Sequence, residues 1–224
     1  MKKQLIISIG TGRCGSVSLS KFLSAQKLTN VIHEGRIDHK KIRKLIKWDN
    51  DENELFKWLE YLISFDNSKF IGDTGMYFLP YIQKIIQKYP SVKIIVMVRE
   101  KDQVVKSYLK KTEGRNHWNH HNGIGWDLDE KWDPCYPKYK LINKKEALEK
   151  YWEEYKLETE SLEKKYTNNL KIWSIDDLNT NKGKNEILDF INFNLERKID
   201  REFKHNTNLK SRKESIINKI KKWF

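Results

Sequence analysis

Short apolar runs alternate with amphipathic segments along most of this chain. The apolar runs cover residues 4–9, 30–33, 69–72, 92–98 and 170–175, and the run at 92–98 is apolar almost throughout. Continuous apolar runs of this length are typical of strands that are buried on both faces of a parallel sheet. We therefore predict five strands, with the strand at 92–98 near the centre of the sheet.

The segments between these runs carry apolar residues at helical spacing. This pattern predicts helices at 16–26, 38–47, 52–65, 77–89, 101–112, 144–166 and 183–193. Strands that alternate with helices indicate an α/β fold of three layers, in which helices cover both faces of a central parallel sheet of about five strands. The sequence shows no internal repeat and no linker, so we expect residues 1–224 to form a single domain.

Two segments depart from this alternation. Residues 113–140 are rich in Trp, His, Asn, Gly and Pro, and we expect an irregular loop there that serves as an acceptor or lid loop. The tail at 205–224 is basic and helical at its end. Its Lys210, Arg212 and Lys213 could approach a phosphate of a ligand, although a solvated basic tail is the simpler interpretation.

The first strand runs directly into a glycine-rich turn. Gly10, Gly12 and Gly15 stand between this strand and a helix that begins at Ser16. The free N–H groups and the dipole of a helix start favour an anion, and glycines let the backbone approach it closely. The stretch predicts a phosphate-binding loop, with an ordinary strand–helix turn as the simpler alternative.

The loop lacks the features of the common nucleotide-hydrolysing enzymes. Gly10 and Gly15 have the spacing of a P-loop, but Ser16 and Val17 stand where that motif has Lys and then Ser or Thr. No strand is a convincing counterpart of the apolar strand whose Asp binds magnesium in those enzymes, which argues against ATP or GTP hydrolysis. Cys14 is not a phosphatase nucleophile, because the required Arg six residues later is absent.

A dinucleotide-binding fingerprint remains an alternative. Gly10, Gly12 and Gly15 fit the G-x-G-x-x-G pattern, and Glu34 stands close to the position of the acidic residue that contacts a ribose. The choice between these ligands depends on a second site. Arg99 follows the strand at 92–98, and Ser107 lies two turns into the next helix, so both could face the same crevice as the glycine loop. Taken alone, they would be a helix-start ion pair and a surface serine.

Together, the two motifs resemble those of the sulfotransferases that use 3′-phosphoadenosine-5′-phosphosulfate (PAPS). In that family a loop after the first strand binds the 5′-phosphosulfate, and an Arg and a Ser eight residues apart bind the 3′-phosphate. The resemblance covers residues 4–195, including the segments 72–81, 132–138 and 147–155. The chain departs from the family at Val17, where many members have Thr, and it has no clear G-x-x-G-x-W-K-like segment in its tail.

This resemblance implies a P-loop-like fold and a transfer of the sulfuryl group of PAPS to a hydroxyl or amine. The product of the donor would be 3′,5′-adenosine bisphosphate (PAP). The residues implied for binding the donor are Gly12, Arg13, Cys14, Gly15, Ser16, Val17, Ser18, Arg99 and Ser107. Arg13 would also stabilise the charge that develops on the bridging oxygen. The reaction requires no metal, so we expect none.

The acceptor hydroxyl needs a general base, and two strand ends supply candidates. His33 and Glu34 follow the second strand, and Asp73 follows the third. A Glu at a similar place is the base in tyrosylprotein and several bacterial sulfotransferases, whereas cytosolic members carry a catalytic His where Asp73 stands. We predict Glu34 as the base, with Asp73 or His33 orienting the acceptor. Alone, Glu34 would be a solvated turn residue, and Asp73 a helix N-cap.

The aromatic residues of 113–140 allow two interpretations that the sequence leaves open. Either they stack on a small-molecule or carbohydrate acceptor, or they pin the loop onto the core. The residues concerned are Trp118, Trp126, Trp132 and Tyr136. His117, His120 and His121 invite a zinc site, but surface or acceptor contacts are the better interpretation of histidines in such a loop. We expect Tyr151, Trp152 and Tyr155 to belong to the core.

Composition narrows the class of partner. The chain has 44 Lys and Arg against 31 Asp and Glu, a net charge of +13, which suits anionic ligands or nucleic acid. The lysines are spread along the chain as on solvated helix faces, so we do not expect nucleic acid as the partner. Two cysteines without a C-x-x-C pair give no disulfide framework or zinc site. No apolar run reaches the length of a membrane span or a signal segment, so we expect a soluble, cytoplasmic protein.

Overall fold

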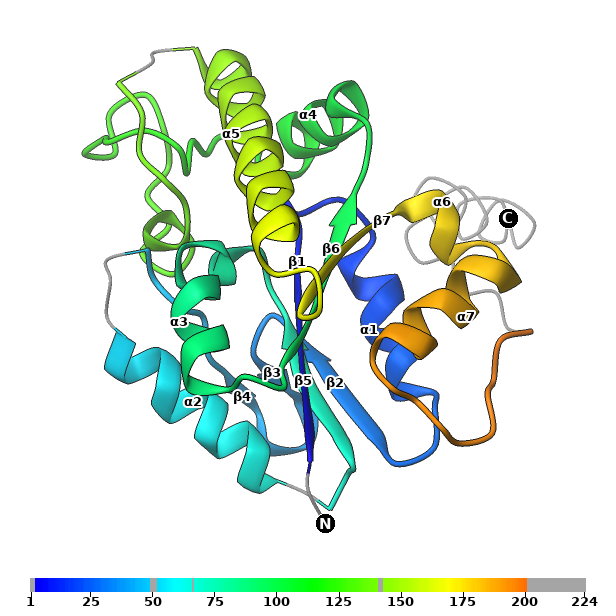
Figure 1. The fold of residues 1–224 in the computed structure, drawn as a ribbon. Helices are drawn as coiled ribbons and strands as arrows, with labels where there is room; N and C mark the ends of the chain where they lie inside the picture. The colour runs from blue at the N-terminus through cyan, green and yellow to red at the C-terminus, as the bar shows by residue number, and fades with distance from the viewer. Residues whose placement is uncertain (1–2, 49–51, 66, 141–142, 201–224) are drawn as a thin grey trace, which may run out of the picture.

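A mostly parallel sheet forms the centre of the protein (Figure 1). The computed structural model describes residues 3–48, 52–65, 67–140 and 143–200. Within these residues the sheet has seven strands in the order β4-β3-β2-β5-β1-β6-β7, of which β3 (Arg36–Ile37) and β4 (Ile42–Arg43) are short antiparallel strands at one edge. Its parallel strands are β2 (Thr29–His33), β5 (Phe70–Thr74), β1 (Gln4–Ile9), β6 (Lys93–Val98) and β7 (Leu170–Ser174). The predicted α/β class and the five parallel strands are confirmed.

Helices cover both faces of this sheet. They are α1 (Ser16–Ser24), α2 (Glu52–Phe65), α3 (Ile82–Lys88), α4 (Lys101–Lys111), α5 (Lys144–Lys165), α6 (Ile175–Leu178) and α7 (Asn181–Phe190). In Figure 1, α1 and α7 lie on one side of the sheet, and α2, α3 and α5 lie on the other. Alternate β1 side chains serve the two faces, because Ile7 and Ile9 belong to one buried cluster and Ile6 to the other.

The predicted helix at 38–47 is wrong. A hairpin edge occupies this region, with β3 (Arg36–Ile37), a 3₁₀ turn at Asp38–Lys40 and β4 (Ile42–Arg43). The cause is the preceding turn, where Glu34 and Gly35 have φ of 50° and 63°. Positive φ at both central residues matches the twist of a two-residue hairpin and folds the chain back antiparallel to β2.

Two other predicted helices have different bounds. The segment predicted at 77–89 begins as a 3₁₀ helix, Met76–Tyr81, because Pro80 cannot donate a helical hydrogen bond, and continues as α3. The helix predicted at 183–193 begins and ends earlier, as α7 at Asn181–Phe190. The segment 113–140 is irregular, as predicted, apart from a 3₁₀ turn at Asp133–Cys135 and one bridge between Asn119 and Tyr139.

The tail predictions for 205–224 and for Lys210, Arg212 and Lys213 lie outside the described residues. Among the residues that are described, no helix combines the length and apolar character that a membrane crossing requires.

Candidate active site

The glycine loop leaves the carboxyl end of β1 and leads into α1 as predicted. Gly12 and Gly15 have φ of 83° and 99°, a region that residues with a side chain adopt only under strain. Space is also lacking, because a Cβ on Gly12 would lie 1.9 Å from the Tyr108 hydroxyl oxygen. Gly15 is the N-cap of α1, and no side chain caps the helix there. The first-turn N–H groups of α1 therefore remain available to an anion.

Cys14 is a buried residue of this loop. Its side chain is 1% exposed, and burial raises the pKa of its thiol to about 11, against the opposite effect of the Gly12, Cys14 and Ser16 backbone N–H groups. The thiol thus stays protonated and contacts no solvent. Any contact of Cys14 with a ligand is confined to its backbone.

The structure brings the two predicted phosphate-binding motifs into contact. Arg13, which has a positive φ of 60°, donates from Nε to Ser107 Oγ at 2.9 Å. Arg99 donates from Nη1 to the backbone oxygen of Arg13 at 3.2 Å and from Nε to Gln103 at 2.7 Å. All three of Arg13, Arg99 and Ser107 are partly exposed. Two guanidinium groups and a hydroxyl therefore meet beside the glycine loop, an arrangement that suits a ligand with more than one phosphate.

The end of β2 adjoins the same loop. The Oγ atom of Ser16 lies 3.0 Å from Nε2 of His33. Burial, together with the charges of Arg43 and Arg13, lowers the pKa of His33 to about 4, so its imidazole is neutral at pH 7. A neutral imidazole at this position can orient a hydroxyl, as predicted for His33, by a hydrogen bond rather than by charge.

Glu34 occupies the tight turn between β2 and β3. Its side chain is 24% exposed, and its Oε2 accepts a hydrogen bond from Nη2 of Arg43 at 2.7 Å. Burial raises the pKa of Glu34, and the charges of Arg43, Arg13 and Lys111 oppose this effect. A partly buried carboxylate with a raised pKa accepts a proton more readily than a solvated one, which suits the predicted role of Glu34 as general base.

Asp73 lies directly behind this turn. Its side chain is 0% exposed, and its carboxylate accepts from the Gly35 N–H, Trp58 Nε1 and the Tyr77 hydroxyl, each at 3.1 Å. This burial contradicts the prediction that Asp73 contacts the acceptor. Asp73 lies within β5 rather than after it, and its side chain is covered by Trp58 of α2 and by Tyr77. Asp73 instead holds the turn that carries Glu34.

The four aromatic residues of 113–140 that the sequence singled out as possible acceptor contacts divide into two groups. Trp118 is 0% exposed and Tyr136 is 6% exposed, so these two pack in the core, and for Trp118 the burial contradicts acceptor contact. Trp126 and Trp132 are partly exposed. The guanidinium of Arg43 lies 4.8 Å from the centre of the Trp132 ring. Trp132 is thereby linked to Glu34 through Arg43.

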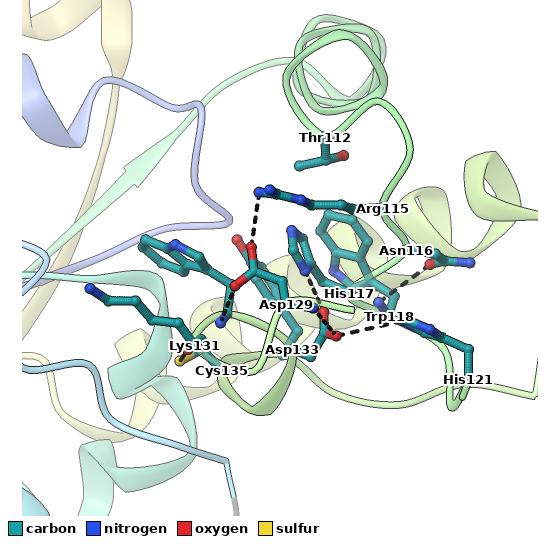
Figure 2. Close-up of polar contacts among 12 residues, drawn as sticks. Thr112, Arg115, Asn116, His117, Trp118, His121, Asp129, Lys131, Asp133 and Cys135 are labelled. Atoms are coloured by element: carbon teal, nitrogen blue, oxygen red, sulfur yellow. Dashed lines mark hydrogen bonds and ion pairs between the residues drawn. The ribbon is translucent and has the colours of Figure 1, made fainter. Parts of the chain in front are cut away.

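Polar contacts hold the rest of this loop together (Figure 2). Asp133 binds Nδ1 of His117 at 2.5 Å, and its other oxygen lies 3.6 Å from Nε2 of His121. Arg115 donates to Asp129 at 2.9 Å. In the described part of the chain, no three His, Cys, Asp or Glu side chains are arranged to hold a metal ion. These histidines serve the packing of the loop.

Sequence reasoning missed Arg43 and three tyrosines. The predicted helix at 38–47 includes Arg43, whereas in the structure Arg43 lies on β4 and pairs with Glu34. Tyr108, Tyr151 and Tyr155 are buried, but their hydroxyl groups bond the backbone of Gly10 and Thr11. Helical periodicity predicts that such residues are buried, and this prediction includes Tyr151 and Tyr155. Periodicity does not show which group a buried hydroxyl forms a hydrogen bond with.

Comparisons with known proteins identify the family of this chain. A family model described as a sulfotransferase domain matches residues 5–173. Among solved structures, the chain is similar to a sulfotransferase from Alicyclobacillus acidocaldarius, with a TM-score of 0.54, 12% identity and coverage of 97% of this chain and 92% of that one. At this identity the likeness shows the fold alone. A search of curated proteins found no match. The family match spans most of the chain, so this protein belongs to the sulfotransferase domain family, whose reaction is sulfuryl transfer.

Proposed function

We propose that this protein transfers the sulfuryl group of PAPS to a hydroxyl of a small-molecule or carbohydrate acceptor. The observation that carries the proposal is the contact between the glycine loop and the Arg99–Ser107 motif, made through Arg13. A ligand with phosphates at both its 5′ and 3′ ends uses both motifs, whereas ATP or NAD leaves the second without its partner.

The residues present fit this donor. The uncapped start of α1 and the Gly12–Ser18 loop offer N–H groups and the Ser16 and Ser18 hydroxyls to the 5′-phosphosulfate. Arg99 and Ser107 would hold the 3′-phosphate. When bound, PAPS supplies an activated sulfuryl group whose leaving group is a phosphate.

Each residue beside the glycine loop has a separate role in the proposed transfer. Glu34 would accept the proton of the acceptor hydroxyl while the hydroxyl oxygen forms its bond to sulfur. The Arg13 guanidinium would stabilise the negative charge that the bridging oxygen gains as its bond to sulfur breaks. His33, held by Ser16, orients the hydroxyl. Asp73 fixes the Glu34–Gly35 turn from behind through the Gly35 N–H.

Trp132 supports a carbohydrate acceptor. Its ring is partly exposed and is linked through Arg43 to Glu34, the proposed base. Aromatic faces beside a catalytic carboxylate suit the apolar face of a sugar ring. An amine acceptor would use the same base.

A transfer assay tests the proposal. Labelled PAPS is incubated with a panel of sugars, phenols and amines, and labelled product is counted for the wild type and for Glu34→Gln. We expect product from a hydroxyl acceptor, a loss of roughly 10²-fold or more in Glu34→Gln, and unchanged PAP binding in that variant. Transfer from ATP, or hydride transfer with NAD, in place of sulfuryl transfer would contradict the proposal.

A further inference from the structure

Three buried tyrosines form a layer behind the glycine loop. Tyr108 comes from α4, and Tyr151 and Tyr155 come from α5. All three are at most 4% exposed. Their rings belong to one aromatic cluster, in which Tyr151 and Tyr155 meet edge to face with centroids 5.6 Å apart. Core packing alone would be satisfied by phenylalanine at each position.

The hydroxyl groups do more than fill space, because each of them bonds the backbone at the start of the loop. The backbone oxygen of Thr11 accepts from Tyr108 at 2.6 Å and from Tyr151 at 3.0 Å. The Tyr155 hydroxyl accepts from the Gly10 N–H at 3.0 Å and donates to the Met76 backbone oxygen at 3.1 Å. Burial raises the pKa of all three hydroxyls, so they remain protonated donors.

The two hydroxyls on Thr11 fix one peptide plane. The carbonyl of Thr11 and the N–H of Gly12 belong to the same planar group, so holding the oxygen also sets the direction of the N–H and the path of the next residues. Gly12 has room for this arrangement only because it lacks a side chain, since a Cβ there would lie 1.9 Å from the Tyr108 hydroxyl oxygen. Gly12 and the Tyr108 hydroxyl are therefore complementary.

Tyr108 also follows Ser107 directly on α4. Ser107 holds the guanidinium of Arg13, while Tyr108 holds the backbone two residues before it. Two consecutive residues of α4 thus hold both the backbone of the glycine loop and the guanidinium of Arg13. A rigid helix is a more accurate support for a binding loop than the loop itself.

We propose that Tyr108 and Tyr151 are positioning residues that set the geometry of the 5′-phosphosulfate subsite through the Thr11 carbonyl. This inference rests on the proposed function, because it assigns the 5′ end of the donor to the loop. Removal of both hydroxyls leaves the Thr11 oxygen buried without these donors, and the loop has to shift to satisfy it.

The test compares two nucleotides that differ at the 5′ position. PAP carries both phosphates, and adenosine 3′-monophosphate lacks the one that the loop would hold. We expect Tyr108→Phe and Tyr151→Phe each to weaken PAP binding several-fold, and the double variant to weaken it by about tenfold or more. Binding of adenosine 3′-monophosphate stays unchanged. Tyr81→Phe is the matched control. The Tyr81 hydroxyl donates to the backbone oxygen of Lys47 and not to the glycine loop, so its removal should change the binding of neither nucleotide.

The outcomes separate the two claims. Absence of PAP binding by the wild type overturns the proposed function and this inference with it. Wild-type binding with no change in the variants overturns the positioning role alone. Equal losses for both nucleotides show a general structural effect and also overturn it. If the double variant fails to fold by circular dichroism, the two single variants, which each retain one hydroxyl on Thr11, decide the matter.

Discussion

The guanidinium Nε of Arg13 lies 2.9 Å from the hydroxyl oxygen of Ser107, although 94 positions separate the two residues. This contact joins the loop after β1 to the helix after β6. The two strands are neighbours in the sheet, so their carboxyl ends open onto the same edge. The candidate site therefore lies at the carboxyl ends of β1 and β6, where the segments that follow these two strands come into contact.

Arg13→Ala should slow transfer more than it weakens nucleotide binding. The charge that Arg13 neutralises develops only as the bond to sulfur breaks, so the effect belongs to the transition state. We expect kcat to fall by about 10²–10³-fold, with a much smaller change in the Kd of PAP. Calorimetry and initial rates measure the two quantities. A loss confined to Kd would contradict this role, and Arg36→Ala, an exposed arginine paired with Asp38, is the control.

Arg99→Ala should show the opposite pattern. The 3′-phosphate is unchanged between the bound ground state and the transition state, so a guanidinium that binds it stabilises both states equally. We expect PAP to bind about 10–100-fold more weakly, with a smaller change in kcat. Some loss of rate is expected as well, because Arg99 also holds the Arg13 backbone. If adenosine 5′-monophosphate lost as much affinity as PAP, the assignment of Arg99 to the 3′-phosphate would fail.

Arg43→Gln should move the acidic limb of the pH–rate profile to higher pH. Arg43 lowers the pKa of Glu34, in opposition to burial, so its removal lets that pKa rise. A general base works only when deprotonated, and a higher pKa therefore costs activity on the acid side. The profile of kcat against pH for wild type and variant measures the shift. An acidic limb that stays in place or moves to lower pH would show that Glu34 is not the base.

Asp73 should make stability depend on pH. Burial raises its pKa from 3.8 to about 7, so the folded protein holds this proton more tightly than the unfolded chain. Its contribution to stability is fully present below about pH 4 and is lost as pH rises through about 7. Urea unfolding across this range, compared with Asp73→Asn, measures the difference. Parallel curves of unfolding free energy against pH would contradict the prediction.

Much of the fold could be predicted because its strands are buried on both faces. Continuous apolar runs such as 92–98 have one stable environment in an α/β protein, and the sequence shows them plainly. The edge hairpin could not be predicted in the same way. Ile42, Leu45 and Ile46 have the i, i+3, i+4 spacing of a helix, whereas the positive φ of Glu34 and Gly35 turns the chain into β3.

The site shows the same division between local pattern and tertiary contact. Gly12, Gly15, Arg99 and Ser107 carry signals in their type and spacing, and the structure brings their motifs together. Asp73 carries no signal of burial, because its position inside the sheet depends on which strand pairs with which. The same is true of the pairing between Glu34 and Arg43, which exists only because β3 and β4 fold back at the edge.

Calorimetric titration of the wild-type protein with PAP tests the central claim most directly. The account predicts binding of one PAP per chain, with ADP and NAD binding more weakly because they lack the 3′-phosphate that Arg99 and Ser107 would hold. No heat of binding at millimolar PAP, or equal affinity for PAP and ADP, would contradict it.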